Sequence, residues 1–91
     1  MEDRIEKLAQ LLMDTGQAHH QAFLETDGAD PDWAIWYADY LHDKLPEHLG
    51  VTLAKSTISD QLTQLNDRQA QDAPGADWPR YYARFLLERY G

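Results

Sequence analysis

Hydrophobic residues recur every three or four positions over most of this chain, which places them on one face of an α-helix. The first run predicts a long helix over residues 3–25, ended by Asp27-Gly28. Gly16 lies inside it and costs about 1 kcal/mol relative to alanine. The predicted apolar face of this helix consists of Ile5, Leu8, Leu12, Thr15, His19, Ala22 and Thr26, widened by Leu11 and Phe23.

A second apolar stripe predicts a helix that follows Asp30 or Asp32 and that ends or kinks at Pro46. An aspartate caps the start of a helix, and Pro31 suits the first turn. Residues 46–49 are expected to form one further turn, with Gly50 just past its end. The predicted apolar face of the second helix consists of Trp33, Trp36, Tyr37, Tyr40, Leu41 and Leu45.

The third helix has a weaker pattern. Ser56 or Thr57 is the expected cap, Thr52 is a competing start, and residues 72–75 end the helix. Its stripe consists of Ile58, Leu62, Leu65 and Gln69.

Asp77 is expected to cap a fourth helix, with Pro79 in its first turn. The residues expected to face inward are Tyr81, Tyr82, Phe85, Leu86 and Tyr90. Four amphipathic helices with short connections predict an all-α fold, a compact four-helix bundle that forms a single domain over residues 1–91.

The sequence of residues 32–41 returns in residues 77–86. Asp, Trp, Tyr, Ala and Leu recur in register, and two more positions keep an aromatic ring. We therefore expect two helical hairpins, with helices two and four in equivalent places and Trp33 and Trp78 as equivalent core anchors. Either an ancient duplication or two helix starts with the same chemistry would give this pattern.

Composition narrows the class of protein. The absence of cysteine excludes disulfides and thiolate metal sites. No apolar run approaches the roughly 20 residues of a membrane span. Met1-Glu2-Asp3-Arg4 lacks the basic-then-apolar order of a signal peptide, so a cytoplasmic location is expected.

The net charge of −8, from 16 acids and 8 bases, argues against binding to nucleic acid and to anionic membranes. It serves solubility, and it also fits a nucleic-acid mimic that acts on a basic protein. Charge is uneven: Asp39 and Arg84 occupy the same repeat position. Helices two and four therefore carry opposite signs, which favours weak self-association.

Catalytic and metal-binding patterns are absent or weak. The sequence has no nucleophile motif and no phosphate-binding glycine loop. It therefore names no catalytic residue and no cofactor, and it leans against enzymatic activity without excluding catalysis. A metal site in a bundle usually repeats Glu-x-x-His on facing helices, and this chain has none. His19, His42 and Asp39 are the weak candidate ligands, although a lone inward histidine is more often hydrogen-bonded in the core.

Adjacent aromatic residues on helices two and four cannot all point to the same centre. The outward rings are expected to join a protein-binding surface, where Trp, Tyr and Arg concentrate affinity. The candidate surface residues are Trp36, Tyr37, Tyr40, Tyr81, Tyr82, Arg80 and Arg84.

Residues 30–41, Asp-Pro-Asp-Trp-x-x-Trp-Tyr-Ala-x-Tyr-Leu, resemble a motif of short uncharacterised bacterial proteins. The resemblance implies a bacterial helical module, and no activity is carried over from it. The leading hypothesis is a non-enzymatic acidic helical interaction module that binds a protein partner or itself. The alternative is a small-molecule or metal site lined by His19, Trp36, Tyr37 and His42. A nucleic-acid mimic is the third hypothesis.

Overall fold

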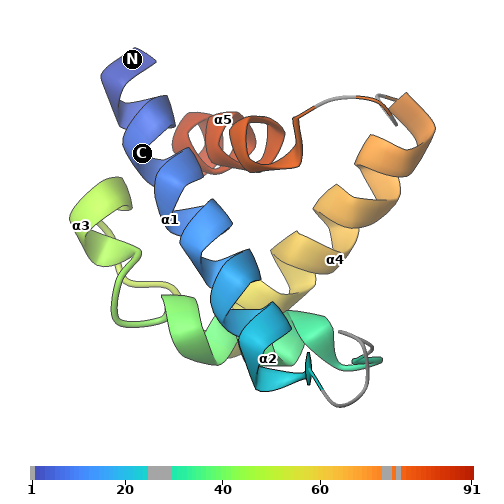
Figure 1. The fold of residues 1–91 in the computed structure, drawn as a ribbon. Helices are drawn as coiled ribbons and strands as arrows, with labels where there is room; N and C mark the ends of the chain where they lie inside the picture. The colour runs from blue at the N-terminus through green and yellow to red at the C-terminus, as the bar shows by residue number, and fades with distance from the viewer. Residues whose placement is uncertain (1, 25–29, 73–74, 76) are drawn as a thin grey trace.

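The computed structural model describes residues 2–24, 30–72, 75 and 77–91. These segments contain helices and no strand, which confirms the all-α class (Figure 1). Four helices have nine residues or more, and α3 is a single turn. The helices are α1 (Glu2–Ala22), α2 (Trp33–Leu41), α3 (Pro46–Leu49), α4 (Lys55–Asp72) and α5 (Trp78–Tyr90).

The observed helix boundaries lie within a few residues of those predicted from the sequence. The turn α3 ends at Gly50, whose φ of 77° lies in the left-handed region that favours glycine. Helix α4 begins at Lys55, between the two starts that the sequence suggests. Helix α1 ends at Ala22, three residues earlier than expected, and its predicted stop at Asp27-Gly28 lies outside the described residues.

Asp32 and Asp77 stand at the N-cap positions of α2 and α5, but neither carboxylate binds a helix N–H. The capping expectation is therefore wrong at the level of side-chain chemistry. The Asp77 carboxylate binds Arg80 instead. Ahead of α2, the backbone N–H of Asp32 donates to Asp30 Oδ1 at 3.0 Å, so the preceding aspartate shapes the entry to that helix.

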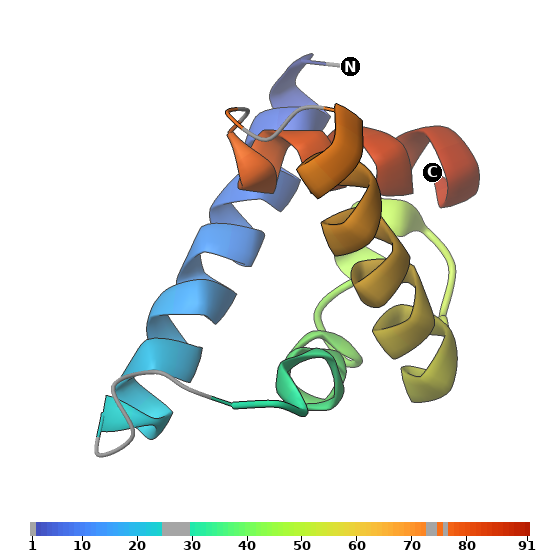
Figure 2. The ribbon, with the colours of Figure 1, turned by 90° about the vertical axis from the view of Figure 1, so that its right-hand side faces the viewer.

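The helices do not pair as two chain-neighbour hairpins. The most extensive packing joins α1 to α5 and α2 to α4, while α1 with α2 and α4 with α5 meet less. Figure 2 shows α1 and α4 apart, with α5 across one end and α2 at the other. Ala38 in α2 and Ala83 in α5 are fully buried, and such small side chains let a crossing helix approach closely.

One cluster of buried side chains holds these helices together. The predicted stripe of α1 is buried from Ile5 to His19, whereas Ala22 is exposed. In α4, Ile58, Leu62 and Leu65 are buried as predicted. The cluster consists of Ile5, Leu8, Ala9, Leu12, Ala34, Ala38, Leu41, Leu45, Leu49, Ile58, Leu62, Leu65, Tyr82, Ala83, Leu86 and Leu87.

Helix α5 buries the ring of Tyr82 as predicted, whereas α2 buries its small side chains more completely than its rings. In α2 the buried residues are Ala34, Ala38 and Leu41, while the predicted inward rings Trp33, Tyr37 and Tyr40 pack half-buried against the core. A helix turns only one narrow stripe fully to the core, and the large rings flank that stripe half-buried. The half-buried rings are Trp33, Trp36, Tyr37, Tyr40, Trp78, Tyr81, Phe85 and Tyr90.

Candidate functional site

Two tryptophan–tyrosine pairs from α2 and α5 face one another across the gap between α1 and α4. Trp33 and Tyr37 are four residues apart, so they share one face of α2, with ring centroids at 5.3 Å. Trp78 and Tyr82 repeat this arrangement in α5 at 5.2 Å. The rings of Tyr37 and Trp78, 6.4 Å apart, join the two pairs. Equivalent residues of the sequence repeat therefore meet at one place.

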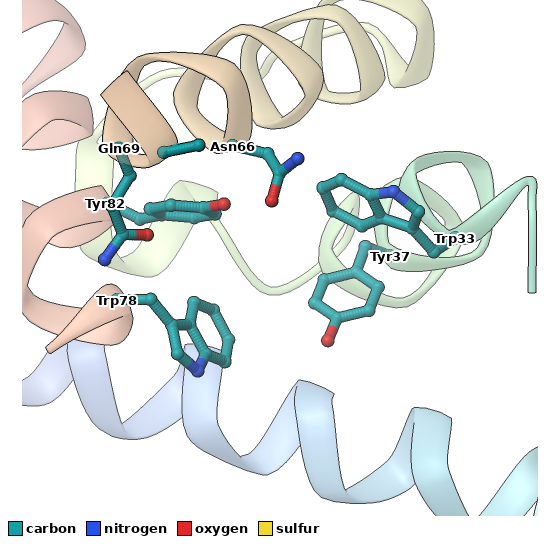
Figure 3. Close-up of a pocket in the computed structure, with 7 residues that line it drawn as sticks. Trp33, Tyr37, Asn66, Gln69, Trp78 and Tyr82 are labelled. Atoms are coloured by element: carbon teal, nitrogen blue, oxygen red, sulfur yellow. The ribbon is translucent and has the colours of Figure 1, made fainter. Parts of the chain in front are cut away.

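These four rings line a pocket with a volume of about 560 Å³, which is within the usual range for small-molecule sites (Figure 3). The remaining lining comes from Asn66, Gln69 and Ala70 of α4. Within the described part of the chain, no acidic or basic side chain lines it. Gln69 belongs to the predicted stripe of this helix, whereas Asn66 and Ala70 were not predicted. Asn66 lies three residues before Gln69 and four before Ala70. This spacing places all three on one helix face and was the available signal.

Burial raises the pKa of the Tyr37 hydroxyl. Burial also raises the pKa of Tyr82 to about 12, and the negative charge of Asp67 adds to this effect. Both hydroxyls are therefore neutral at physiological pH, where each can donate and accept a hydrogen bond.

Gly16 forms the wall of α1 that meets these rings. A Cβ atom at this position would lie 3.3 Å from Cζ2 of Trp78 and 3.4 Å from the hydroxyl of Tyr37. Both distances are near or below ordinary van der Waals contact. The glycine that weakens α1 locally is thus the position at which rings from α5 and α2 reach the first helix.

The buried His19 lies at the end of α1, and its ring centroid is 5.3 Å from that of Tyr37, so it adjoins the ring-lined pocket without lining it. Its Nε2 atom is 3.0 Å from Asp30 Oδ2, and both side chains are about 10% exposed. Its ring lies 4.8 Å from Phe23 and 5.2 Å from Trp36 between centroids. Asp30 directly precedes the turn into α2, so this contact ties the end of α1 to the start of α2. His19 is therefore a hydrogen-bonded packing residue.

The candidate metal ligands are not brought together. His19 binds Asp30, while the exposed Asp39 forms an ion pair with Lys55 at 3.2 Å. His42 is half-buried just beyond α2. Over residues 2–24, 30–72 and 77–91, no three His, Asp or Glu side chains are grouped as a metal ion would need. His19, Trp36 and His42 also stand outside the ring-lined pocket, so only Tyr37 of the predicted small-molecule site contributes to it.

The outward face of α2 carries a stack of rings. Trp36 and Tyr40 have centroids 5.6 Å apart and planes inclined by 14°. The ammonium of Lys44 lies 4.2 Å from the centre of the Tyr40 ring, a cation–π distance. Ile35, which precedes Trp36 in the helix, is 57% exposed. Trp36 and Tyr40 are half-buried, and Tyr40 also packs against the core, so a binding surface on α2 stays a prediction.

Tyr37 and Tyr82 do not belong to an outward surface. Tyr82 is only 4% exposed, and both rings line the pocket. Each lies four residues after a tryptophan on the same helix face, and this spacing turns the pair toward α4. Their assignment to a docking surface is therefore corrected.

On α5, the positive charge of Arg80 is neutralised by two carboxylates of the same chain. The guanidinium of Arg80 makes two hydrogen bonds to the Glu6 carboxylate, each 2.8 Å long, and it also binds Asp77. These contacts fasten α5 to α1. Tyr81 is half-buried and Arg84 is exposed, so Arg84 remains as the outward cation among the predicted surface residues.

No protein-family model matches this sequence, and no curated protein or solved structure shows significant similarity to it. Among the helices of the described segments, none has the length and apolar character needed to cross a membrane.

Proposed function

We propose that this chain is a non-enzymatic acidic interaction module that binds a protein partner through the outward face of α2. The observation that carries this proposal is the half-exposed stack of Trp36 on Tyr40 beside the exposed Ile35. Large aromatic side chains in such positions concentrate binding energy in protein interfaces. This α2 face, defined by Ile35, Trp36 and Tyr40, is flanked by carboxylates.

The flanking charges indicate the chemistry of the partner. Asp32, Asp39 and Asp43 are exposed on or next to α2, and the whole chain has a net charge of −8. Asp39 pairs with Lys55 and Asp43 with Lys44, but these ion pairs are exposed and weak, so a basic partner can compete with the two lysines. An amphipathic segment that presents apolar anchors between lysine and arginine residues complements such a face. The apolar anchors supply affinity, while the charges fix the register and speed the encounter.

A second copy of this chain is the alternative partner. Helix α5 repeats the aromatic positions with Tyr81 and Phe85, and Arg84 replaces Asp39. Internal ion pairs reduce the attraction, because Arg80 is held by Glu6 and Asp39 by Lys55. We therefore propose only weak pairing of the α2 face with α5 of another copy.

We also propose that the fold is a duplicated helix pair, with α3 as a connecting turn. Exchanging α1 with α4 and α2 with α5 maps the two most extensive packings onto each other. Matching positions also share their burial, as in Ala38 with Ala83 and Leu41 with Leu86. In this interpretation, the first helix of each repeat packs on the second helix of the other.

Photo-crosslinking tests the binding proposal directly. A photoreactive amino acid replaces Ile35 in one version of the chain and the exposed Gln64 of α4 in a matched control. We expect a discrete crosslinked partner from position 35 only. The double substitution Trp36→Ala and Tyr40→Ala in the position-35 version should abolish it without unfolding the chain. Equal products from both positions, or a product that survives the double substitution, would contradict the proposal.

Charge reversal measures how much the carboxylates beside the α2 face contribute to binding of the partner. Asp39→Lys should weaken capture of the partner, whereas Asp60→Lys on the exposed side of α4 should not. Sedimentation over a concentration series tests the self-pairing alternative. A strict monomer at hundreds of micromolar, in low and moderate salt, would eliminate that alternative and leave a foreign protein as the partner.

A further inference from the structure

We infer that the ring-lined pocket between α2, α4 and α5 binds a small, uncharged, planar heteroaromatic molecule whose edge carries hydrogen-bond donors and acceptors. This site is distinct from the α2 face, because Trp36 and Tyr40 do not line it. Binding at this site involves no catalytic step and no metal. The shape of the pocket, its charge and its polar groups favour such a ligand.

The shape favours a flat ligand. Trp33 and Tyr37 come from α2 on one side, while Trp78 and Tyr82 come from α5 on the other (Figure 3). Aromatic rings attract one another in offset-stacked and edge-to-face arrangements, so a planar guest gains contacts from both sides. The volume of about 560 Å³ suits a ligand of one or two fused rings with substituents.

The electrostatics disfavour an anionic ligand. The described residues that line the pocket carry no formal charge, and burial raises the pKa of both phenols, which are neutral at physiological pH. An anion would lose hydration here without gaining an opposite charge. The acidic surface of the chain further disfavours anions.

The polar groups favour a ligand with a donor–acceptor edge. In Figure 3 the side chain of Asn66 extends into the space between Tyr82 and Trp33. The Asn66 amide has both a carbonyl acceptor and N–H donors. A carboxamide on a heteroaromatic ring carries the same groups, and a pyridine-type ring nitrogen adds an acceptor. Rings supply most of the contact area, and the Asn66 amide sets the orientation.

The three indole N–H signals of this chain permit a direct test by nuclear magnetic resonance. Trp33 and Trp78 line the pocket and Trp36 does not, so Trp36 is an internal control. Single Trp→Phe substitutions assign the signals. The probes are adenine, nicotinamide and quinoline-3-carboxamide, with nicotinate and quinoline-3-carboxylate as charged counterparts of the two amides.

We expect at least one carboxamide to shift the signals of Trp33 and Trp78 saturably while leaving Trp36 in place. Its carboxylate counterpart should bind at least about tenfold more weakly, because the site offers no counter-charge. No shift with any uncharged probe would overturn the inference. Equal binding of an amide and its carboxylate, or an equal response from all three tryptophans, would also overturn it.

A blocking variant completes the test. Ala70→Phe places a ring at the exposed mouth of the pocket, whereas Gln71→Phe places one on the neighbouring exposed position that does not line it. We expect a loss of probe affinity of about tenfold or more in Ala70→Phe and an unchanged affinity in Gln71→Phe. Unchanged binding in a folded Ala70→Phe protein would place the probe elsewhere and contradict the inference. Neither variant alters the α2 face, so the crosslinking result stands independently.

Discussion

Gly16 and Trp78 are in direct contact across 62 residues of sequence, because a Cβ atom on Gly16 would lie only 3.3 Å from Cζ2 of the indole. Trp78 is itself packed against Tyr82, at 5.2 Å between ring centroids, and against Tyr37 at 6.4 Å. The indole therefore has little room to withdraw. A small residue in the middle of α1 is what lets α5 place this ring against the first helix.

Gly16→Ala is expected to gain no stability, although an interior alanine normally stabilises a helix by about 1 kcal/mol relative to glycine. The tight contact with Trp78 offsets the gain in helix propensity. In a Trp78→Ala background the contact is gone, and the same substitution should recover the full gain. Urea unfolding of the four proteins measures this coupling. A full gain in the wild-type background would show that the indole yields freely.

Trp33→Ala and Trp78→Ala should lower the free energy of unfolding by similar amounts. A fully buried large ring loses about 3–5 kcal/mol on truncation, and half-burial brings the expected loss to about 2–3 kcal/mol. Ile35→Ala, at a position 57% exposed, should change stability by less than about 0.5 kcal/mol. Urea melts compare the three. A loss under about 1 kcal/mol for either tryptophan would count against equivalent anchors.

The Glu6–Arg80 contact should make stability depend on acid pH. Its hydrogen bonds to Arg80 lower the pKa of Glu6 below the ordinary 4.5. A lowered folded-state pKa means that the contribution is complete above 4.5 and disappears as pH falls through the folded value. Glu6→Gln should therefore flatten the fall in melting temperature on acidification, and Glu47→Gln, an exposed control, should not. High salt should reduce the difference in acid sensitivity between wild type and Glu6→Gln. Identical curves of melting temperature against pH for these two proteins would contradict the prediction.

Gln61 offers a stabilising substitution. It is 8% exposed, and its Oε1 atom has no hydrogen-bond partner within the described structure. A buried acceptor without a partner costs about 1–3 kcal/mol, so an apolar side chain of similar shape should relieve this loss. Gln61→Met is expected to raise the free energy of unfolding by about 1 kcal/mol, measured in urea. Gln64→Met, on the exposed side of α4, is the control and should have little effect. Destabilisation by Gln61→Met would indicate that a water molecule satisfies the amide.

Divalent metals should leave the melting temperature unchanged. His19 is paired with Asp30, and Asp39 is paired with Lys55. A metal that binds the folded state must raise stability by mass action. Thermal melts with zinc, nickel or iron test this expectation. A reproducible rise that disappears in His19→Ala or His42→Ala would assign these residues a metal site after all.

The positions of the helices were readable from the sequence, because interactions within three or four residues decide them. The apolar spacing of α1, the proline at the second position of α5 and Gly50 after α3 each act locally. The buried part of the α1 stripe, including His19, followed from the same spacing. The equivalence of Trp33 and Trp78 that the sequence pattern suggests stays a prediction.

The pairing of the helices and the pocket depended on the tertiary structure. The sequence suggested chain-neighbour hairpins, whereas α1 packs on α5 and α2 packs on α4, and Ala38 and Ala83 are fully buried. Which surfaces meet depends on how side-chain volumes fit between segments far apart in the chain. Arg80 binds Glu6 across 74 residues, and Asn66 of α4 lines one pocket together with rings of α2 and α5. Local spacing specifies each helix face, but only packing in three dimensions determines which faces meet.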